Sequence, residues 1–230
     1  MYKYWLKKIF VKEDDQMQLN TVYELETEEF KPTVVWLHGA NQTSLSFSYL
    51  RRLCDFENEY LVDYSSNTRF FENLSRMVQD LKGQGPFFFV GHSMGGLYAL
   101  HLSQQLETVG GISISTPFRG SSAADWAKYL VPNYALFKDI GRKSLPVTEA
   151  ECIHLDIPWY QIVSVTGNVP YVKTPNDGVC TLASMTCRTD IEHIQVPHNH
   201  YEVMCSTIVA DIIKEKYREI SRVYQIHMNE

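Results

Sequence analysis

Short apolar runs alternate with amphipathic segments along most of the chain. The runs predict strands at residues 33–37, 59–64, 87–90, 109–115, 160–166 and 192–196. Apolar residues at helical spacing predict helices at residues 45–53 and 70–81, directly after Ser93, and after Asn199. Strands that alternate with helices at this spacing imply right-handed crossovers and a mostly parallel sheet.

Two segments depart from this alternation. Residues 4–11 and 18–25 mix β-branched and aromatic residues around a polar turn at 13–16, which predicts a β-hairpin at the edge of a sheet. Residues 117–158 contain helical pieces and no clear strand, which predicts a cap over the carboxyl edge of the sheet; ordinary helix packing is the alternative. Because no linker or repeat interrupts the chain, we expect one domain over 1–230 with the cap as an insertion.

The last predicted helix has its own start signal. Asn199 is a candidate N-cap, and Glu202 three residues later completes a capping box. The inner stripe of this helix is expected to comprise Val203, Met204, Thr207, Ile208 and Ile212.

Composition restricts the partners that the protein is expected to bind and the cellular compartment in which it is expected to occur. A net charge of -6 and a pI near 5.8 argue against nucleic-acid binding. The N-terminus lacks the features of a secretory signal, and no stretch is long enough to span a membrane. The five scattered cysteines indicate a reducing, cytoplasmic location, although one disulfide between Cys180 and Cys187 stays open as an alternative.

The most specific motif is G-H-S-M-G-G at residues 91–96, which follows an apolar run and opens a predicted helix. A strand that turns sharply into a helix presents the residue at the turn, so Ser93 is a candidate nucleophile. The N–H of Met94 then lies at a helix N-terminus, where unpaired donors and the helix dipole stabilise an oxyanion. The strand, turn and helix context favours this interpretation over a chance match.

Five motifs occur in one order along residues 33–217. They are H-G-A-N-Q at 38–42, the elbow at 91–96, S-T-P-F-R-G-S at 115–121, N-D-G-V at 176–179 and a histidine pair before the last helix. In this order the chain resembles the α/β-hydrolase fold, in its lipase and esterase branch. Phe118 stands where lipases usually have histidine, which weakens the likeness to true lipases. The resemblance implies a serine nucleophile, an acid and a histidine, with no cofactor.

The family places the acid on a loop after a late strand, which points to Asp177. An Asp-Gly turn is rigid, and Asp177 follows the strand predicted at 160–166; a plain surface turn is the alternative. Asp190, Asp156 and Asp63 are weaker candidates because none combines a turn with that position.

The candidates for the base are His198 and His200. A helix that begins after Asn199 puts His200 three residues before Val203 and seven before Thr207, on the expected buried stripe. We therefore favour His200 over His198.

The family pattern supplies the second oxyanion donor from the backbone N–H of Ala40, with Asn41 as competitor. His38 and His92 are not assigned as bases: the H-G histidine usually braces its loop, and the neighbour of the elbow serine points away from it. A zinc site of Cys180, Cys187, His198 and His200 matches no common spacing, so no metal is expected.

The predicted cap suggests the substrate. Trp126, Tyr129 and Leu130 lie close enough along a helix to form one apolar face, which favours an acyl chain. We expect a serine hydrolase of carboxylic esters that acts on a small-molecule ester, without nucleic acid or stable membrane insertion. An acyltransferase or thioesterase with the same triad is the alternative, and an inactive binding protein is a third hypothesis.

Overall fold

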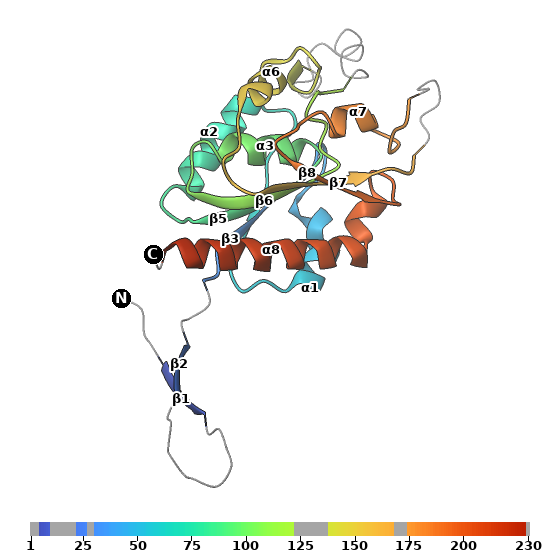
Figure 1. Ribbon diagram of the computed structural model, residues 1–230. Coiled ribbons are helices and arrows are strands. Elements are labelled where there is room, and N and C mark those ends of the chain that lie inside the picture. Colours follow the sequence, from blue (N-terminus) through green and yellow to red (C-terminus); the bar gives the residue numbers. More distant parts are fainter. Residues whose placement is uncertain (1–4, 10–21, 27–29, 122–137, 168–173, 229–230) are drawn as a thin grey trace, which may run out of the picture.

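A six-stranded, wholly parallel sheet forms the centre of the computed structural model, which describes residues 5–9, 22–26, 30–121, 138–167 and 174–228 (Figure 1). The strand order is β4-β3-β5-β6-β7-β8. The strands are β3 (Thr33–Leu37), β4 (Glu59–Val62), β5 (Phe87–His92), β6 (Thr108–Ile114), β7 (Trp159–Ser164) and β8 (Glu192–Val196). The predicted parallel sheet is therefore confirmed, with strand ends shifted by at most two residues.

Helices cover both faces of the sheet (Figure 1). One face carries α2 (Phe70–Leu81), α3 (Met94–Leu102) and α6 (Leu145–Cys152), and the other carries α1 (Ser48–Cys54) and α8 (Thr207–Met228). The shorter elements are η1 (Ser44–Phe47), α7 (Leu182–Met185) and η2 (Glu202–Cys205).

Alternation along the strands divides the core between these two faces. Val35 and Leu37 pack with α2 and α3, whereas Val34 and Trp36 pack with α1 and α8. Successive side chains of a strand point to opposite faces, so a strand covered on both sides is apolar at every position. This explains the continuous apolar runs of the sequence.

Sheet topology determines where a site can form. β3 lies between β4 and β5, so the chain leaves β3 toward one edge and later returns to its other side. Ligands of open parallel sheets bind outside the carboxyl ends of the strands at such a switch point. Ser93 directly follows β5 at this end of the sheet.

The N-terminal hairpin exists, but its predicted place at the edge of the main sheet was wrong. β1 (Trp5–Ile9) and β2 (Val22–Glu26) pair antiparallel in a two-stranded sheet of their own. Each strand pairs with its neighbour in the hairpin, and the edges of the six-stranded sheet are β4 and β8.

The prediction of one continuous helix from Asn199 was also wrong. The capping box forms, since Asn199 Oδ1 accepts the Glu202 N–H at 2.9 Å and Glu202 Oε2 accepts the Asn199 N–H at 3.1 Å. It caps only the single turn η2, because Ser206 has an extended backbone and α8 starts afresh at Thr207. The break resets the helical phase, so Thr207 and Ile208 are exposed. The buried residues at the start of α8 are instead Val209, Ala210 and Ile213.

The described residues of the predicted cap are 117–121 and 138–158, and the longer of these segments is anchored to the main sheet and its helices. Asp139 is buried and accepts the backbone N–H of Phe70 at 2.8 Å, which satisfies the N-terminus of α2. Val147 and Ala150 of α6 lie in the core beside α3. Residues 122–137, which include Trp126, Tyr129 and Leu130, lie outside the described residues, so the cap over 117–158 stays a prediction.

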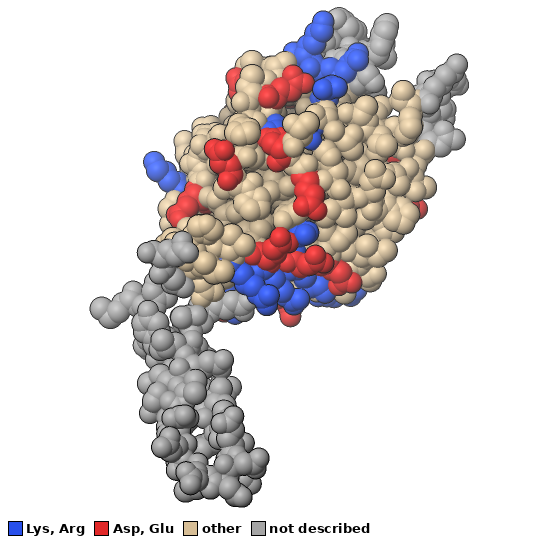
Figure 2. All heavy atoms as spheres, in the orientation of Figure 1, with Lys and Arg blue, Asp and Glu red and all other residues tan. Residues whose placement is uncertain are grey.

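Charges of both signs alternate along the exposed side of α8. Lys214 pairs with Asp211 at 2.8 Å and Lys216 with Glu219 at 3.0 Å, and the face in Figure 2 shows basic and acidic side chains side by side there. Among the described residues, none of the helices has the length and apolar character needed to cross a membrane.

Candidate active site

The backbone turns sharply at Ser93 between β5 and α3. Ser93 has φ 52° and ψ −119°, a conformation that an L residue adopts only under strain, and its N–H donates to Ile114 O at 2.8 Å. Strain of about 1–3 kcal/mol is typical of such positions, which cluster at functional sites. The predicted elbow at residues 91–96 therefore exists.

Two glycines of the motif are required by close packing. A Cβ on Gly91 would lie 2.6 Å from backbone atoms of Gly95, and a Cβ on Gly95 would lie 2.0 Å from the carbonyl oxygen of Leu37. Real Cβ atoms do not approach backbone so closely, so the first turn of α3 touches the end of β3 only because these residues are glycine. The elbow and the loop after β3 are thus in contact.

The loop after β3 contains Ala40 and Asn41, the two candidates for the second oxyanion donor. A Cβ on Gly39 would lie 3.3 Å from the Cβ of Ser93, so this loop borders the elbow. The N–H of Asn41 already donates to Ser66 Oγ at 2.9 Å, which favours Ala40 over its competitor. Met94 is the first residue of α3, so its N–H has no acceptor within the helix.

His38 braces this loop, as the resemblance implies. Its Nε2 accepts the Tyr64 N–H at 3.2 Å, which leaves the proton on Nδ1 to donate to Gly39 O at 2.8 Å. The Tyr64 ring stacks on the imidazole at 4.1 Å. Burial lowers the pKa of His38, which favours the neutral form that this arrangement needs.

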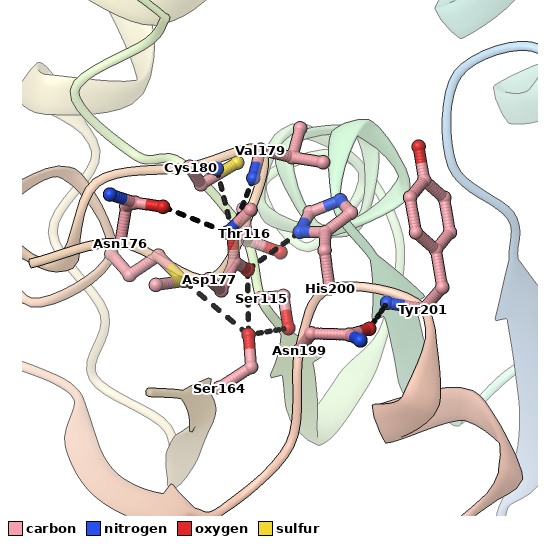
Figure 3. A network of polar contacts seen from close by, with 12 residues as sticks. Ser115, Thr116, Ser164, Asn176, Asp177, Val179, Cys180, Asn199, His200 and Tyr201 are labelled. Carbon is pink, nitrogen blue, oxygen red and sulfur yellow. Dashed lines mark hydrogen bonds and ion pairs between the residues drawn. The ribbon is translucent and has the colours of Figure 1, made fainter. Parts of the chain in front are cut away.

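Asp177 is fully buried and every acceptor position of its carboxylate faces a donor (Figure 3). Oδ1 accepts the N–H of Val179 at 3.0 Å and of Cys180 at 2.6 Å. Oδ2 accepts the Ser164 hydroxyl at 2.6 Å and contacts Nδ1 of His200 at 2.7 Å. The turn at 176–179 is therefore not a plain surface turn: Gly178 and Val179 are exposed, but Asn176 and Asp177 are buried.

These donors decide the charge of Asp177. Burial by itself would raise the pKa of this carboxyl, but hydrogen bonds from His200, Ser164 and the Cys180 amide outweigh it and hold the pKa below its ordinary value. A carboxylate that stays charged beside an imidazole fixes the imidazole orientation and stabilises an imidazolium.

The structure brings His200, and not His198, to Asp177. His200 is 3% exposed and its N–H also donates to the carbonyl oxygen of Asp177 at 2.9 Å. His198 is half-buried, its carbonyl accepts the Thr166 N–H at 3.0 Å, and its Nε2 has no hydrogen-bond partner. His200 precedes η2 in a turn, so its predicted place on a helix face was wrong.

The other carboxylates considered from the sequence serve elsewhere. Asp190 pairs with Arg188, and Asp63 accepts the N–H and the hydroxyl of Ser44 at 2.6 and 2.8 Å. Asp156 has a 91% exposed side chain.

His92 connects the elbow to the His200 loop. Its Nε2 lies 3.0 Å from the carbonyl oxygen of His200, and its Nδ1 lies 3.1 Å from Gln42 Oε1. Burial lowers its pKa to about 3, so the ring is neutral. Through His92, Ser93 and His200 are brought to the same edge of the sheet. Among the described residues no hydrogen bond joins the Ser93 hydroxyl to His200; such bonds often tighten only when substrate is bound.

One group of described residues has metal-ligand spacing: atoms of Asp177, Cys180 and His200 lie within 4.8 Å of one another. Asp177 and His200 are already bonded to each other, and burial raises the pKa of the Cys180 thiol well above its ordinary value. This donor set is therefore poorly suited to a metal. All five cysteines are free, including Cys180 and Cys187.

Two further residues of the site, Ser115 and Ser164, were not predicted from the sequence to belong to the hydrogen-bond network of Asp177. Their hydroxyls lie 2.6 Å apart, and that of Ser164 reaches Asp177. The available signal was a polar residue near the carboxyl end of each of two apolar strands that become neighbours in the sheet.

The sequence matches the alpha/beta hydrolase family over residues 34–197, well over half of the chain. The chain belongs to the alpha/beta hydrolase family. The match includes the elbow and Asp177 and ends just before His200. Among curated proteins, none matches this sequence.

Solved structures share the fold at low sequence identity. A metagenomic carboxyl esterase is similar with a TM-score of 0.64 and 12% identity over 94% of this chain and 83% of that chain. A lipase-esterase related protein from Clostridium acetobutylicum has a TM-score of 0.54 and 14% identity over 82% and 93%. Human thioesterase 2 has a TM-score of 0.51 and 14% identity over 83% and 96%. These similarities show the fold of an alpha/beta hydrolase. The reaction must be inferred from the residues of the site.

Proposed function

We propose that this alpha/beta hydrolase cleaves carboxylic esters through an acyl-enzyme formed on Ser93. The observation that carries the proposal is the buried pair of Asp177 and His200, held at 2.7 Å beside the elbow that presents Ser93. A serine hydroxyl is a weak nucleophile at neutral pH and requires such an oriented base.

In the first half-reaction, the Ser93 oxygen attacks the ester carbonyl while Nε2 of His200 takes its proton. Asp177 accepts the hydrogen bond from Nδ1 and stabilises the imidazolium without taking the proton. Two backbone N–H groups, of Met94 and Ala40, face the oxyanion of the tetrahedral intermediate; each such donor is typically worth about 3 kcal/mol.

Collapse of that intermediate breaks the ester C–O bond. The imidazolium returns its proton to the alcohol oxygen as the alcohol leaves. Water then gives a proton to His200 and attacks the acyl-enzyme, and a second collapse releases the acid and restores the Ser93 hydroxyl.

The proposed substrate is an ester with an apolar acyl chain. This rests on Trp126, Tyr129 and Leu130, which the sequence places on one apolar helix face and which lie outside the described residues. Each buried methylene is worth about 0.8 kcal/mol, so kcat/KM is expected to rise from acetate to hexanoate esters. A flat chain-length profile would contradict this part of the proposal.

The test is hydrolysis of p-nitrophenyl acetate and butyrate by the wild type and by Ser93→Ala. We expect turnover in the wild type and a loss of about 10⁴-fold or more in the variant, with an unchanged circular dichroism spectrum. If purified Ser93→Ala were as active as the wild type, the serine mechanism would be contradicted. A parallel panel of acyl thioesters distinguishes an esterase from a thioesterase.

A further inference from the structure

The oxygen of Asp177 that faces His200 also accepts a hydrogen bond from Ser164. Ser164 Oγ lies 2.6 Å from Asp177 Oδ2, and Nδ1 of His200 lies 2.7 Å from the same atom. Ser164 ends β7 and is fully buried. It holds that oxygen from the opposite side of the carboxylate to the backbone amides on Oδ1 (Figure 3).

The direction of this hydrogen bond is fixed by charge. An ionised carboxylate can only accept, so the one hydroxyl proton of Ser164 points to Asp177. Ser164 Oγ lies 2.6 Å from Ser115 Oγ, and with its own proton committed it can only accept there. Ser115 is therefore the donor, and the two hydroxyls form a chain that ends on Asp177.

Ser115 has an unusual backbone conformation. It follows β6, is fully buried and has φ 51°, a region that favours glycine, while its N–H donates to Ile162 O at 2.8 Å. Strained non-glycine residues persist where the surroundings fix them, often at functional sites. In this conformation the Ser115 hydroxyl contacts that of Ser164, at the end of the neighbouring strand β7.

We propose that Ser164, oriented in turn by Ser115, is a positioning residue that holds the Asp177 carboxylate against His200. This inference rests on the proposed function, since it concerns the same triad. When His200 gains the Ser93 proton, the carboxylate must stay ionised and must not rotate. A charge-assisted hydrogen bond from Ser164 serves both needs, because it favours the charged form and fixes Oδ2 in line with Nδ1.

The alternative is a purely structural role, in which the two serines merely satisfy each other inside the core. Ser113 provides a matched control for it. Ser113 lies on β6, is fully buried, and accepts the indole N–H of Trp159 at 2.8 Å, away from Asp177. Loss of its hydroxyl disturbs a buried hydrogen bond of the same strand without touching the triad.

The test compares the Ser164→Ala, Ser115→Ala, Ser164→Thr and Ser113→Ala variants of the full chain. For Ser164→Ala we expect kcat on p-nitrophenyl butyrate to fall about 10-fold or more with KM unchanged, because Ser164 does not touch substrate. Ser115→Ala is expected to lose about 3-fold, Ser164→Thr to retain most activity, and Ser113→Ala to stay near wild type.

Two further readouts separate positioning from stability. Loss of this donor makes the Asp177 carboxylate more basic, so the coupled Asp177–His200 pair should bind its proton more tightly. The fall of kcat/KM toward low pH should then move to higher pH in Ser164→Ala and less so in Ser115→Ala. The proton NMR resonance of His200 Nδ1–H should shift in the same order. If Ser115 acts through Ser164, adding Ser115→Ala to Ser164→Ala should cause no additional loss.

The outcomes are distinct. Wild-type kcat, pH profile and Nδ1–H resonance in Ser164→Ala overturn the positioning role, provided that Ser93→Ala is inactive. An active Ser93→Ala would instead overturn the proposed function. If Ser164→Ala does not fold, Ser115→Ala decides: a shifted acid limb supports the chain of hydroxyls, and a wild-type profile contradicts it.

Discussion

Asp177 and His200 are joined twice, once through their side chains and once through their backbones. Nδ1 of His200 lies 2.7 Å from Asp177 Oδ2, and the His200 N–H donates to the Asp177 carbonyl oxygen at 2.9 Å. Two loops separated by 23 residues thus fix the histidine relative to the carboxylate before any substrate is present. Preorganised geometry of this kind is what general base catalysis requires.

This relationship predicts different results for the two neighbouring histidines. His200→Ala should lower kcat by about 10³-fold or more, because the base is lost. His198→Ala should stay within about 3-fold of wild type, since its ring does not reach Asp177. Steady-state hydrolysis of p-nitrophenyl butyrate measures both. An inactive His198→Ala beside an active His200→Ala would reverse the assignment.

Asp177→Asn should keep the fold and lose activity. The amide has the size of the carboxylate but cannot stabilise an imidazolium, so kcat should fall by about 10³-fold or more while KM changes little. The matched control is Asp190→Asn, which alters a carboxylate paired with Arg188 outside the site. We expect the control to affect the melting temperature but not kcat; full activity in Asp177→Asn would contradict the role of this acid.

Gly95→Ala should disrupt the elbow. The added Cβ would lie 2.0 Å from the Leu37 carbonyl oxygen, so α3 must move away from the end of β3 and carry Met94 with it. Gly83→Ala is the control, because Gly83 has φ +77° but open space around the new Cβ. We expect a cost of about 1 kcal/mol in the control and several times more in Gly95→Ala, by urea unfolding. Equal costs would show that close packing at the elbow is unimportant.

The buried His92 predicts a pH dependence of stability. Its folded pKa is lowered to about 3, whereas an unfolded histidine titrates near 6.5. As the pH falls below about 6.5, only the unfolded chain gains this proton, so the free energy of unfolding falls by about 1.4 kcal/mol per pH unit until about pH 3.

A His92→Gln variant tests this by urea unfolding at pH 7, 6 and 5. Its stability should fall less steeply than that of the wild type, although part of the slope should remain because burial also lowers the pKa of His38 and His101. An unchanged slope would show that His92 accepts a proton in the folded protein.

The sequence predicted the sheet because its strands are covered on both faces. A run such as residues 33–37 must be apolar at every position for Val34 and Val35 to enter cores on opposite sides. The elbow was predictable for a similar reason, since Gly91 and Gly95 have no room for a side chain. The sheet and the elbow were therefore predictable because close packing at these positions restricts which residue types can occur there.

Other features depend on tertiary contacts that leave a weaker trace. The spacing of apolar residues does not reveal the helix break at Ser206. The predicted buried stripe therefore included Thr207 and Ile208, which are exposed. In the sequence Ser115 and Ser164 look like ordinary strand residues. Their contacts arise because β6 and β7 are neighbours in the sheet and the loop that carries Asp177 packs against Ser164. These contacts can be recognised only in the folded structure.

Labelling with a fluorophosphonate, followed by mass mapping of the modified peptide, tests most directly whether Ser93 is the nucleophile. The reagent bonds covalently to a serine activated by a base and an oxyanion site. We predict one adduct, on Ser93, that forms in step with loss of esterase activity and is absent from His200→Ala. An adduct on another residue, or full loss of activity with Ser93 unmodified, would contradict the assignment of Ser93 as the nucleophile.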